Sequence, residues 1–268
     1  MITNQEFLKF IGASSELKLP GLWQNQFFLL IPGLKKIDEL GINYDILGKD
    51  AKGEYTCIIK DLKWIIESAK SREEAIAGAL DEFIKNKNRK DRLDKFKEFV
   101  KECHGDQVRK YTGEPYWHHF EGIEKASTGF GTHWIEGNEE IIWGHDLLED
   151  TDCTQKMLED KLVELEYPLE LVHLIVNGIL ELTDIYTTKA YPKLNRKKRK
   201  ILESERLSKI SSNSQTIKYL DIENNLVSIK EHDPDFFGTF FREVSDNLRV
   251  MKSGNSIIRN RVIKKLYE

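Results

Sequence analysis

Residues 141–150 set one histidine and three carboxylates among apolar side chains. If this run is helical, His145 and Glu149 share one face and Asp146 and Asp150 share the next, because residues four apart lie above one another. A buried carboxylate without a partner is very costly, so this arrangement calls for a cation or a metal. The adjacent His–Asp pair suits a metal of the Mn, Fe and Zn group. The same run would also suit an acidic helix end with solvated side chains.

The composition describes an ordinary globular protein. Of its 268 residues, 40% are hydrophobic and 32% are charged, which excludes global disorder and fits one large or two small domains. The net charge of -4 argues against nucleic acid as the main partner. No apolar stretch is long enough for a membrane span and the first residues lack a signal-peptide pattern, so we expect a cytoplasmic protein. Three cysteines without paired spacing indicate neither disulfides nor a zinc knuckle: Cys57, Cys103 and Cys153.

Residues 1–90 differ in pattern from the rest and predict a small α+β region. Two β-leaning runs, 41–47 and 54–59, flank a polar segment and predict a hairpin. Residues 71–74 form a capping signal for a helix that follows. This region contains no catalytic cluster. It could dock on the remainder, dimerise or sense a ligand, and the sequence does not choose among these roles.

The remainder, residues 91–268, predicts an all-helical domain, so the fold class is mainly α. A polar joint at residues 86–91 marks the expected boundary. Apolar residues at helical spacing then predict helices after residue 91, from 155 to about 180, from about 212 to 228, from 236 to 251 and from 257 to 266. Asp152 or Thr154 would cap the second of these helices.

Several polar residues outside the central run could join it. Gly113 and Pro115 break a helical pattern, and the loop would present Arg109 and Lys110 on one side and two histidines on the other. The cations suit an anionic substrate or a solvated helix end. Residues 189–200 hold seven basic and no acidic residues, which predicts either a solvated helix start or an anion-collecting edge.

A later helix places Asp221, Asn225 and Ser228 on one face, and Asp221 could supply a further metal ligand. Four other histidines stand alone in the sequence, and for them we expect structural roles: His104, His133, His173 and His232.

The order of His119, His145–Asp146 and Asp221 resembles the HD phosphohydrolase superfamily. The finer resemblance is to RelA/SpoT-type alarmone hydrolases, especially the small enzymes of metazoan SpoT-homologue type. It rests on the segment that ends at His119, the HD-xx-ED-T pattern and two later stretches, which together are residues 104–119, 145–154, 191–197 and 215–225. Three positions depart from the usual pattern and alter the wall of the pocket or the core: Phe120, Trp143–Gly144 and Leu220.

This resemblance implies a hydrolase with one bound divalent metal, Mn²⁺. The implied metal ligands are His119, His145, Asp146 and Asp221. Glu149 and Asp150 would orient a water molecule and accept its proton. The implied substrate contacts are Arg109, Lys110, Lys193, Arg196, Asn225 and Ser228.

Three functions are compatible with these residues. The first is a manganese-dependent 3′-pyrophosphohydrolase of (p)ppGpp, or of the adenosine counterparts (p)ppApp. The second is another HD-domain phosphatase, acting on nucleotides or on the 2′-phosphate of NADPH. The third is a non-catalytic HD module whose first 90 residues bind a partner, although the intact Glu149–Asp150 pair speaks against it. The expected partner is a small nucleotide, while the base preference and the oligomeric state stay open. No synthetase segment follows, so we expect no second, alarmone-making activity.

Overall fold

The chain is mainly α, as the sequence predicts, with strands only in its first part among the residues described. The computed structural model describes residues 44–49, 55–59, 64–69, 72–128 and 135–268. Contacts divide the chain into two compact units, residues 1–91 and residues 92–268. No helix in the described part is long and apolar enough to cross a membrane.

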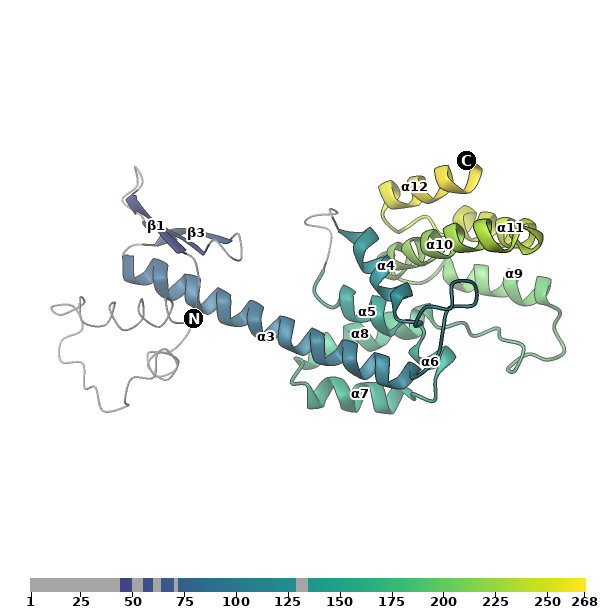
Figure 1. Cartoon of the computed structure of the whole chain (residues 1–268), viewed down its shortest axis with the longest axis horizontal. Coiled ribbons are helices and arrows are strands. Elements are labelled where there is room, and N and C mark those ends of the chain that lie inside the picture. Colours follow the sequence, from purple (N-terminus) through teal and green to yellow (C-terminus); the bar gives the residue numbers. More distant parts are fainter. Residues whose placement is uncertain (1–43, 50–54, 60–63, 70–71, 129–134) are drawn as a thin grey trace. The chain divides into compact units, whose positions relative to one another are not determined.

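The first unit contains an antiparallel sheet with the strand order β1-β2-β3 (Figure 1). The strands are β1 (Tyr44–Lys49), β2 (Tyr55–Ile59) and β3 (Trp64–Ala69). The pairing of β1 with β2 confirms the predicted hairpin, whose turn lies outside the described residues. The third strand, β3, was not predicted; it pairs with β2.

Helix α3 (Arg72–His104) begins beside the predicted capping signal. It continues through residues 86–91, so the prediction that a new helix begins after this polar joint is wrong. The joint has the sequence Asn-Lys-Asn-Arg-Lys-Asp, and without glycine or proline none of these residues costs a helix much. The division between the two units falls within this helix.

The second unit is built around α10, which contacts α4, α5, α8, α11 and α12. Its helices are α4 (His118–Ser127), α5 (Asn138–Gly144), α6 (Leu147–Asp150), α7 (Gln155–Glu164), α8 (Leu169–Leu182), α9 (Arg196–Leu207), α10 (Ser212–His232), α11 (Pro234–Val250) and α12 (Ser256–Tyr267). Figure 1 shows α12 above α10 and α11. The single helical stretch expected over residues 155–180 is two helices, because Glu166 has a φ of 60° and Pro168 precedes α8.

Side-chain caps fix where five of these helices begin. In each case an oxygen of the capping residue accepts a hydrogen bond from a backbone N–H in the first turn, which would otherwise lack a partner. The capping residues are Thr154, Asn195, Ser211, Asp233 and Asn255. The cap at Thr154 confirms one of the two residues that the sequence offered for the start of α7.

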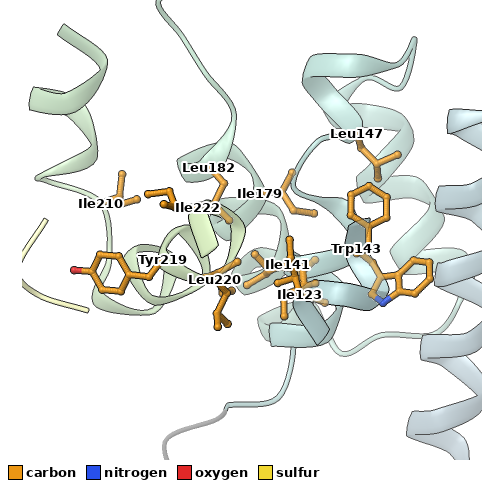
Figure 2. Close-up of a cluster of buried hydrophobic side chains, with 14 of the residues drawn as sticks. Ile123, Ile141, Trp143, Leu147, Ile179, Leu182, Ile210, Tyr219, Leu220 and Ile222 are labelled. Atoms are coloured by element: carbon orange, nitrogen blue, oxygen red, sulfur yellow. The ribbon is translucent and has the colours of Figure 1, made fainter. Parts of the chain in front are cut away.

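The core of this unit lies between α5, α8 and α10. Figure 2 shows Ile141, Ile179 and Leu220 gathered in it, with Trp143 at one side. All four side chains are buried. The amphipathic spacing along α8 explains its orientation, because its buried residues recur every three or four positions: Val172, Ile175, Val176, Ile179 and Leu182. This core holds the segments that carry the candidate ligands.

The central run is not one helix, which corrects the expectation for residues 141–150. Helix α5 ends at Gly144 and α6 begins at Leu147, so His145 and Asp146 form the junction. Neighbouring residues of a regular helix point about 100° apart. At the junction, however, His145 Nε2 lies 3.2 Å from Asp146 Oδ2. Both residues keep backbone angles of the right-handed helical region, so the two side chains themselves bend toward one point.

The contact between α8 and α5 depends on a glycine. A Cβ atom on Gly178 would lie 2.5 Å from Cδ1 of the buried Ile141, so Gly178→Ala should destabilise the fold. Overpacking costs about 1–3 kcal/mol, and the better helix propensity of alanine offsets up to about 1 kcal/mol. Gly238 in α11 has no such neighbour, so Gly238→Ala should instead stabilise by about 0.5–1 kcal/mol. Urea unfolding measures the free energy of unfolding of both variants. An equal change in the two variants would contradict the packing argument.

Candidate metal centre

Four side chains from three separate segments converge in the second unit. His119 comes from the first turn of α4, His145 and Asp146 from the α5–α6 junction, and Asp221 from the middle of α10. Asp221 Oδ1 lies 3.2 Å from His119 Nε2 and 3.8 Å from His145 Nε2. Asp146 Oδ2 lies 3.2 Å from His145 Nε2 and 3.9 Å from His119 Nε2. The structure thus brings together all four predicted ligands.

Both imidazole rings present Nε2 to the carboxylates because Nδ1 is bonded elsewhere. His119 Nδ1 lies 2.8 Å from Asn224 Oδ1, and His145 Nδ1 lies 2.7 Å from the carbonyl oxygen of Ile142. These acceptors favour a proton on Nδ1 and leave a lone pair on Nε2. Such outer hydrogen bonds are typical of metal-binding histidines.

The residues fit a divalent metal ion. His145 Nε2 is buried and makes no hydrogen bond, although it faces two carboxylates. Burial lowers the pKa of His145, but Asp146 and Asp221 outweigh burial and raise that pKa to about 9. A proton or a metal ion would satisfy this nitrogen, and only a metal would satisfy both histidines and both carboxylates together.

Two neighbours hold the carboxylates in place. Lys218 Nζ lies 2.9 Å from Asp221 Oδ2, the oxygen that faces away from His119. Burial raises the pKa of Asp221, but Lys218 and the histidines hold it well below its usual range. The hydroxyl of Tyr116 donates to Asp146 Oδ2 over 2.8 Å. Asp221 therefore stays ionised, and the side chains of both aspartates are held in position.

Glu149 and Asp150 lie on the short helix α6, next to this group. Glu149 Oε2 accepts a hydrogen bond from the backbone N–H of Asp184 over 3.1 Å. Burial and the charge of Asp184 raise the pKa of Glu149 to about 7. Burial and the charge of Asp146 also raise the pKa of Asp150. Glu149 can therefore exchange a proton near neutral pH.

A cavity of about 240 Å³ opens beside these groups. Its charged lining consists of Asp146, Glu149, Asp150, Asp184, Glu203, Asp221 and Glu243, with Lys200 and Lys218. Carboxylates outnumber lysines, so an anion would be repelled unless bound cations offset their charge. The apolar wall comes from α9, α10 and α11 through Leu207, Ile222, Phe240 and Val244.

The predicted substrate residues lie in different places. Asn225 lines the cavity, where its Nδ2 donates to Asp221 Oδ1 over 2.7 Å. Arg196 lies outside the lining and makes two hydrogen bonds to Glu243, which is part of it. Lys193 is exposed, and Ser228 accepts a hydrogen bond from His232 through its carbonyl oxygen.

The two predicted cations of the loop before α4 also lie outside the lining. Lys110 Nζ forms an ion pair of 3.1 Å with Asp233 on the protein surface. Arg109 Nη1 instead donates to Asn224 Oδ1 over 2.9 Å, so it contacts the residue that holds His119.

The remaining histidines of the described part lie outside the cluster of ligands. His118 is more exposed than its neighbour and pairs with Glu121 at 3.2 Å. His104 lies 2.6 Å from Gln107 and stacks on Tyr116. His173 is exposed, whereas His133 lies outside the described residues.

Sequence reasoning missed several residues of this site. Lys218 could have been found, because it precedes Asp221 by three positions in a predicted helix and such residues are neighbours. Asn224 follows Asp221 by three positions and carries the same local signal, and Lys200 belongs to the basic run at residues 189–200. Asp184 reaches the site only through a contact between distant segments, which leaves no local signal.

No protein-family model matches the chain, and no curated protein matches it in sequence. Among solved structures, it is similar to a metazoan ortholog of SpoT, a protein that hydrolyzes ppGpp and plays a role in starvation responses. The two share 18% sequence identity with a TM-score of 0.54, over 66% of this chain and 94% of the other. At this identity the likeness establishes the fold alone. The resemblance expected from the sequence is therefore confirmed at that level: this chain shares the fold of that SpoT ortholog.

Proposed function

We propose that this protein is a manganese-dependent 3′-pyrophosphohydrolase of (p)ppGpp or its adenosine counterparts. One observation carries the proposal: two histidines and two aspartates converge beside a cavity that two further carboxylates, Glu149 and Asp150, also line. The shared fold with a ppGpp hydrolase supports it. The reaction adds water across the 3′ ester and releases pyrophosphate, so ppGpp would yield GDP.

His119, His145, Asp146 and Asp221 would hold the metal ion. Two nitrogen and two carboxylate ligands suit Mn²⁺ among other first-row metals. When bound, a divalent metal polarises the phosphoryl group and makes a coordinated water more acidic. It would also offset the negative charge of the cavity lining, which otherwise repels a polyphosphate.

Glu149 and Asp150 would orient the attacking water and accept its proton. A general base works best when its pKa lies near the working pH, and the pKa of Glu149 is raised to about 7. The N–H of Asp184 holds one oxygen of Glu149. Asp150 in turn receives a long hydrogen bond of 3.4 Å from Gln107. The backbone N–H of Asp184 thus fixes one oxygen of Glu149, whereas the longer contact holds Asp150 less firmly.

Lys218 and Lys200 would attract the phosphates, because both line the cavity and charge-assisted hydrogen bonds to phosphate are strong. Asn225 would hydrogen-bond the ribose or a phosphate. Lys193 and Arg196 would contact the parts of the substrate that extend beyond the cavity. We assign the same outer role to Lys110 and Ser228.

The leading alternative is another HD-type phosphatase, acting on a nucleotide or on the 2′-phosphate of NADPH. A non-catalytic module is the other, and the carboxylates beside the cavity argue against it, since a module without turnover has no use for them. Both alternatives differ from our proposal in the products that they predict.

Product identity tests the proposal. The Mn²⁺-loaded protein is incubated with ppGpp, pppGpp, their adenosine counterparts and NADPH, and the products are separated by anion-exchange chromatography. We expect GDP and pyrophosphate from ppGpp, with chelation stopping the reaction and Mn²⁺ restoring it. Release of orthophosphate would favour the general phosphatase. No turnover of any substrate by the metal-loaded protein would favour the non-catalytic module.

A further inference from the structure

Arg109 and His119 meet on one oxygen atom. The Oδ1 atom of Asn224 lies 2.9 Å from Arg109 Nη1 and 2.8 Å from His119 Nδ1. Arg109 precedes α4, His119 belongs to α4, and Asn224 belongs to α10. Gly122 lies against the nitrogen end of the Asn224 carboxamide, since a Cβ on Gly122 would be 2.4 Å from Asn224 Nδ2. The carboxamide is therefore enclosed by α4 and the loop before it.

Arg109 decides which end of this carboxamide faces His119. An asparagine side chain can turn by 180° and exchange its oxygen for its nitrogen with little change in shape. A guanidinium group has five donors and no acceptor, so only the oxygen can face it. Because the same oxygen faces His119, Arg109 holds the carboxamide in the orientation that accepts from the ring.

The orientation of Asn224 in turn decides which nitrogen of His119 carries the proton. An oxygen beside Nδ1 requires a proton there and leaves the lone pair on Nε2, which faces Asp221 Oδ1 at 3.2 Å. A reversed carboxamide would donate to Nδ1 and drive the proton to Nε2, where it blocks a metal. His145 carries no such risk, because its Nδ1 faces a backbone carbonyl, which is always an acceptor.

We propose that Arg109 and Asn224 are positioning residues for the metal ligand His119, with Arg109 acting through Asn224 to keep Nε2 open to the metal. This inference rests on the metal centre of the proposed function. It assigns Arg109 a task that differs from the phosphate clamp expected from the sequence. A clamp acts on the substrate, whereas this role is exerted on metal binding before any substrate arrives.

Arg109→Met tests the inference in the full-length protein without substrate. We expect Mn²⁺ to bind about tenfold more weakly, the lower end of the effect of outer hydrogen bonds on metal affinity. Free Mn²⁺ is measured by its electron paramagnetic resonance signal. Lys110→Met is the matched control for Mn²⁺ affinity. It removes the adjacent cation, which pairs with Asp233 and not with Asn224. Unchanged affinity in Arg109→Met with a raised KM would overturn the inference in favour of a clamp.

Two changes at position 224 separate positioning from a loss of folding. Asn224→Leu removes the acceptor and should weaken Mn²⁺ binding by about 10- to 100-fold. Asn224→Asp accepts at both oxygens and cannot be reversed, so it should keep the affinity. Adding Asn224→Asp to Arg109→Met should therefore rescue metal binding. A merely structural defect of Arg109→Met would persist in the double variant, and that result would also overturn the inference.

The ring itself gives a second readout. Nitrogen chemical shifts of histidine distinguish the two neutral tautomers, so a ¹⁵N spectrum of metal-free protein, recorded at a pH high enough to make the ring neutral, should show His119 protonated at Nδ1, and a mixture in Arg109→Met. If the natural protein binds no Mn²⁺ at all, the metal centre fails. If it binds Mn²⁺ and the spectrum is the same in both proteins, only the role of Arg109 fails.

Discussion

Replacing His145 or Asp221 with alanine should remove tightly bound Mn²⁺ and reduce the turnover of ppGpp to the background rate. His145 Nε2 has no other partner, and Asp221 Oδ1 is the oxygen that faces both imidazole rings. Each substitution removes one of the four metal ligands and leaves a coordination position without a protein ligand. A catalytic metal makes bound water more acidic and also polarises the phosphoryl group, so the loss should exceed the roughly 10²- to 10⁴-fold that a general base contributes.

The metal content after desalting and the rate of pyrophosphate release measure this effect. Asp221→Ala also leaves Lys218 without its partner, and breaking a buried ion pair typically costs about 3–5 kcal/mol. The double change with Lys218→Met removes that cost and should restore folding without restoring the metal. Asp160→Ala, at an exposed ion pair, is the control. Full metal content and full activity in both alanine variants would reject this centre.

Part of the candidate site can be predicted from the sequence because several of its residues are close together in the chain. His145, Asp146, Glu149 and Asp150 lie within six positions, and their order with His119 and Asp221 follows a known family pattern. Their joint position could not be derived from helix geometry. Neighbouring residues of a helix are expected to point apart, whereas the side chains of His145 and Asp146 approach to 3.2 Å at the junction of α5 and α6.

Contacts between distant segments explain most of what the sequence did not predict. Arg109 and Asn224 are 115 positions apart, so no spacing rule links them. From the sequence alone, a cation such as Arg109 near a predicted metal site is interpreted as a phosphate clamp. Only the structure shows that its hydrogen-bond acceptor is Asn224. The same applies to Asp184, whose N–H reaches Glu149 across 35 positions.

Helix positions were predicted more reliably than breaks. Amphipathic spacing gives the starts of α7 and α10 to within about a residue, and for α7 a capping residue agrees with it. The polar joint at residues 86–91 shows the limit of this reasoning. Polar residues indicate exposure, and an exposed stretch without glycine or proline can remain helical.

Glu149→Gln and Asp150→Asn should leave the metal in place while turnover falls by about 10²- to 10⁴-fold, the usual contribution of a general base. Both substitutions keep the size of the side chain and remove the group that accepts the proton. The aspartates that approach the imidazole nitrogens are Asp146 and Asp221, each at 3.2 Å. Glu149 and Asp150 make no such contact. The metal content should therefore stay normal and KM should change little, because the lost interaction belongs to the transition state.

The pH dependence identifies which carboxylate is the base. A base must be ionised, so kcat/KM should fall tenfold per pH unit below the pKa of that group in the free enzyme. For Glu149 that pKa is raised to about 7, and a bound cation, which stabilises the ionised form, moves it downward. The acid limb should thus lie at or below pH 7. Glu149→Gln should abolish this limb if Glu149 is the base, whereas Asp150→Asn should retain it.

A third variant, Asp184→Asn, tests the direction in which the pKa of Glu149 shifts. The charge of Asp184 raises the pKa of Glu149, while its backbone N–H lowers that pKa. Asp184→Asn removes the charge and keeps the N–H, so the pKa of Glu149 should fall and the acid limb should move to lower pH. A limb that stays fixed in Asp184→Asn and persists in Glu149→Gln would assign the proton transfer to another group. Near-normal turnover in both Glu149→Gln and Asp150→Asn would remove these carboxylates from the mechanism.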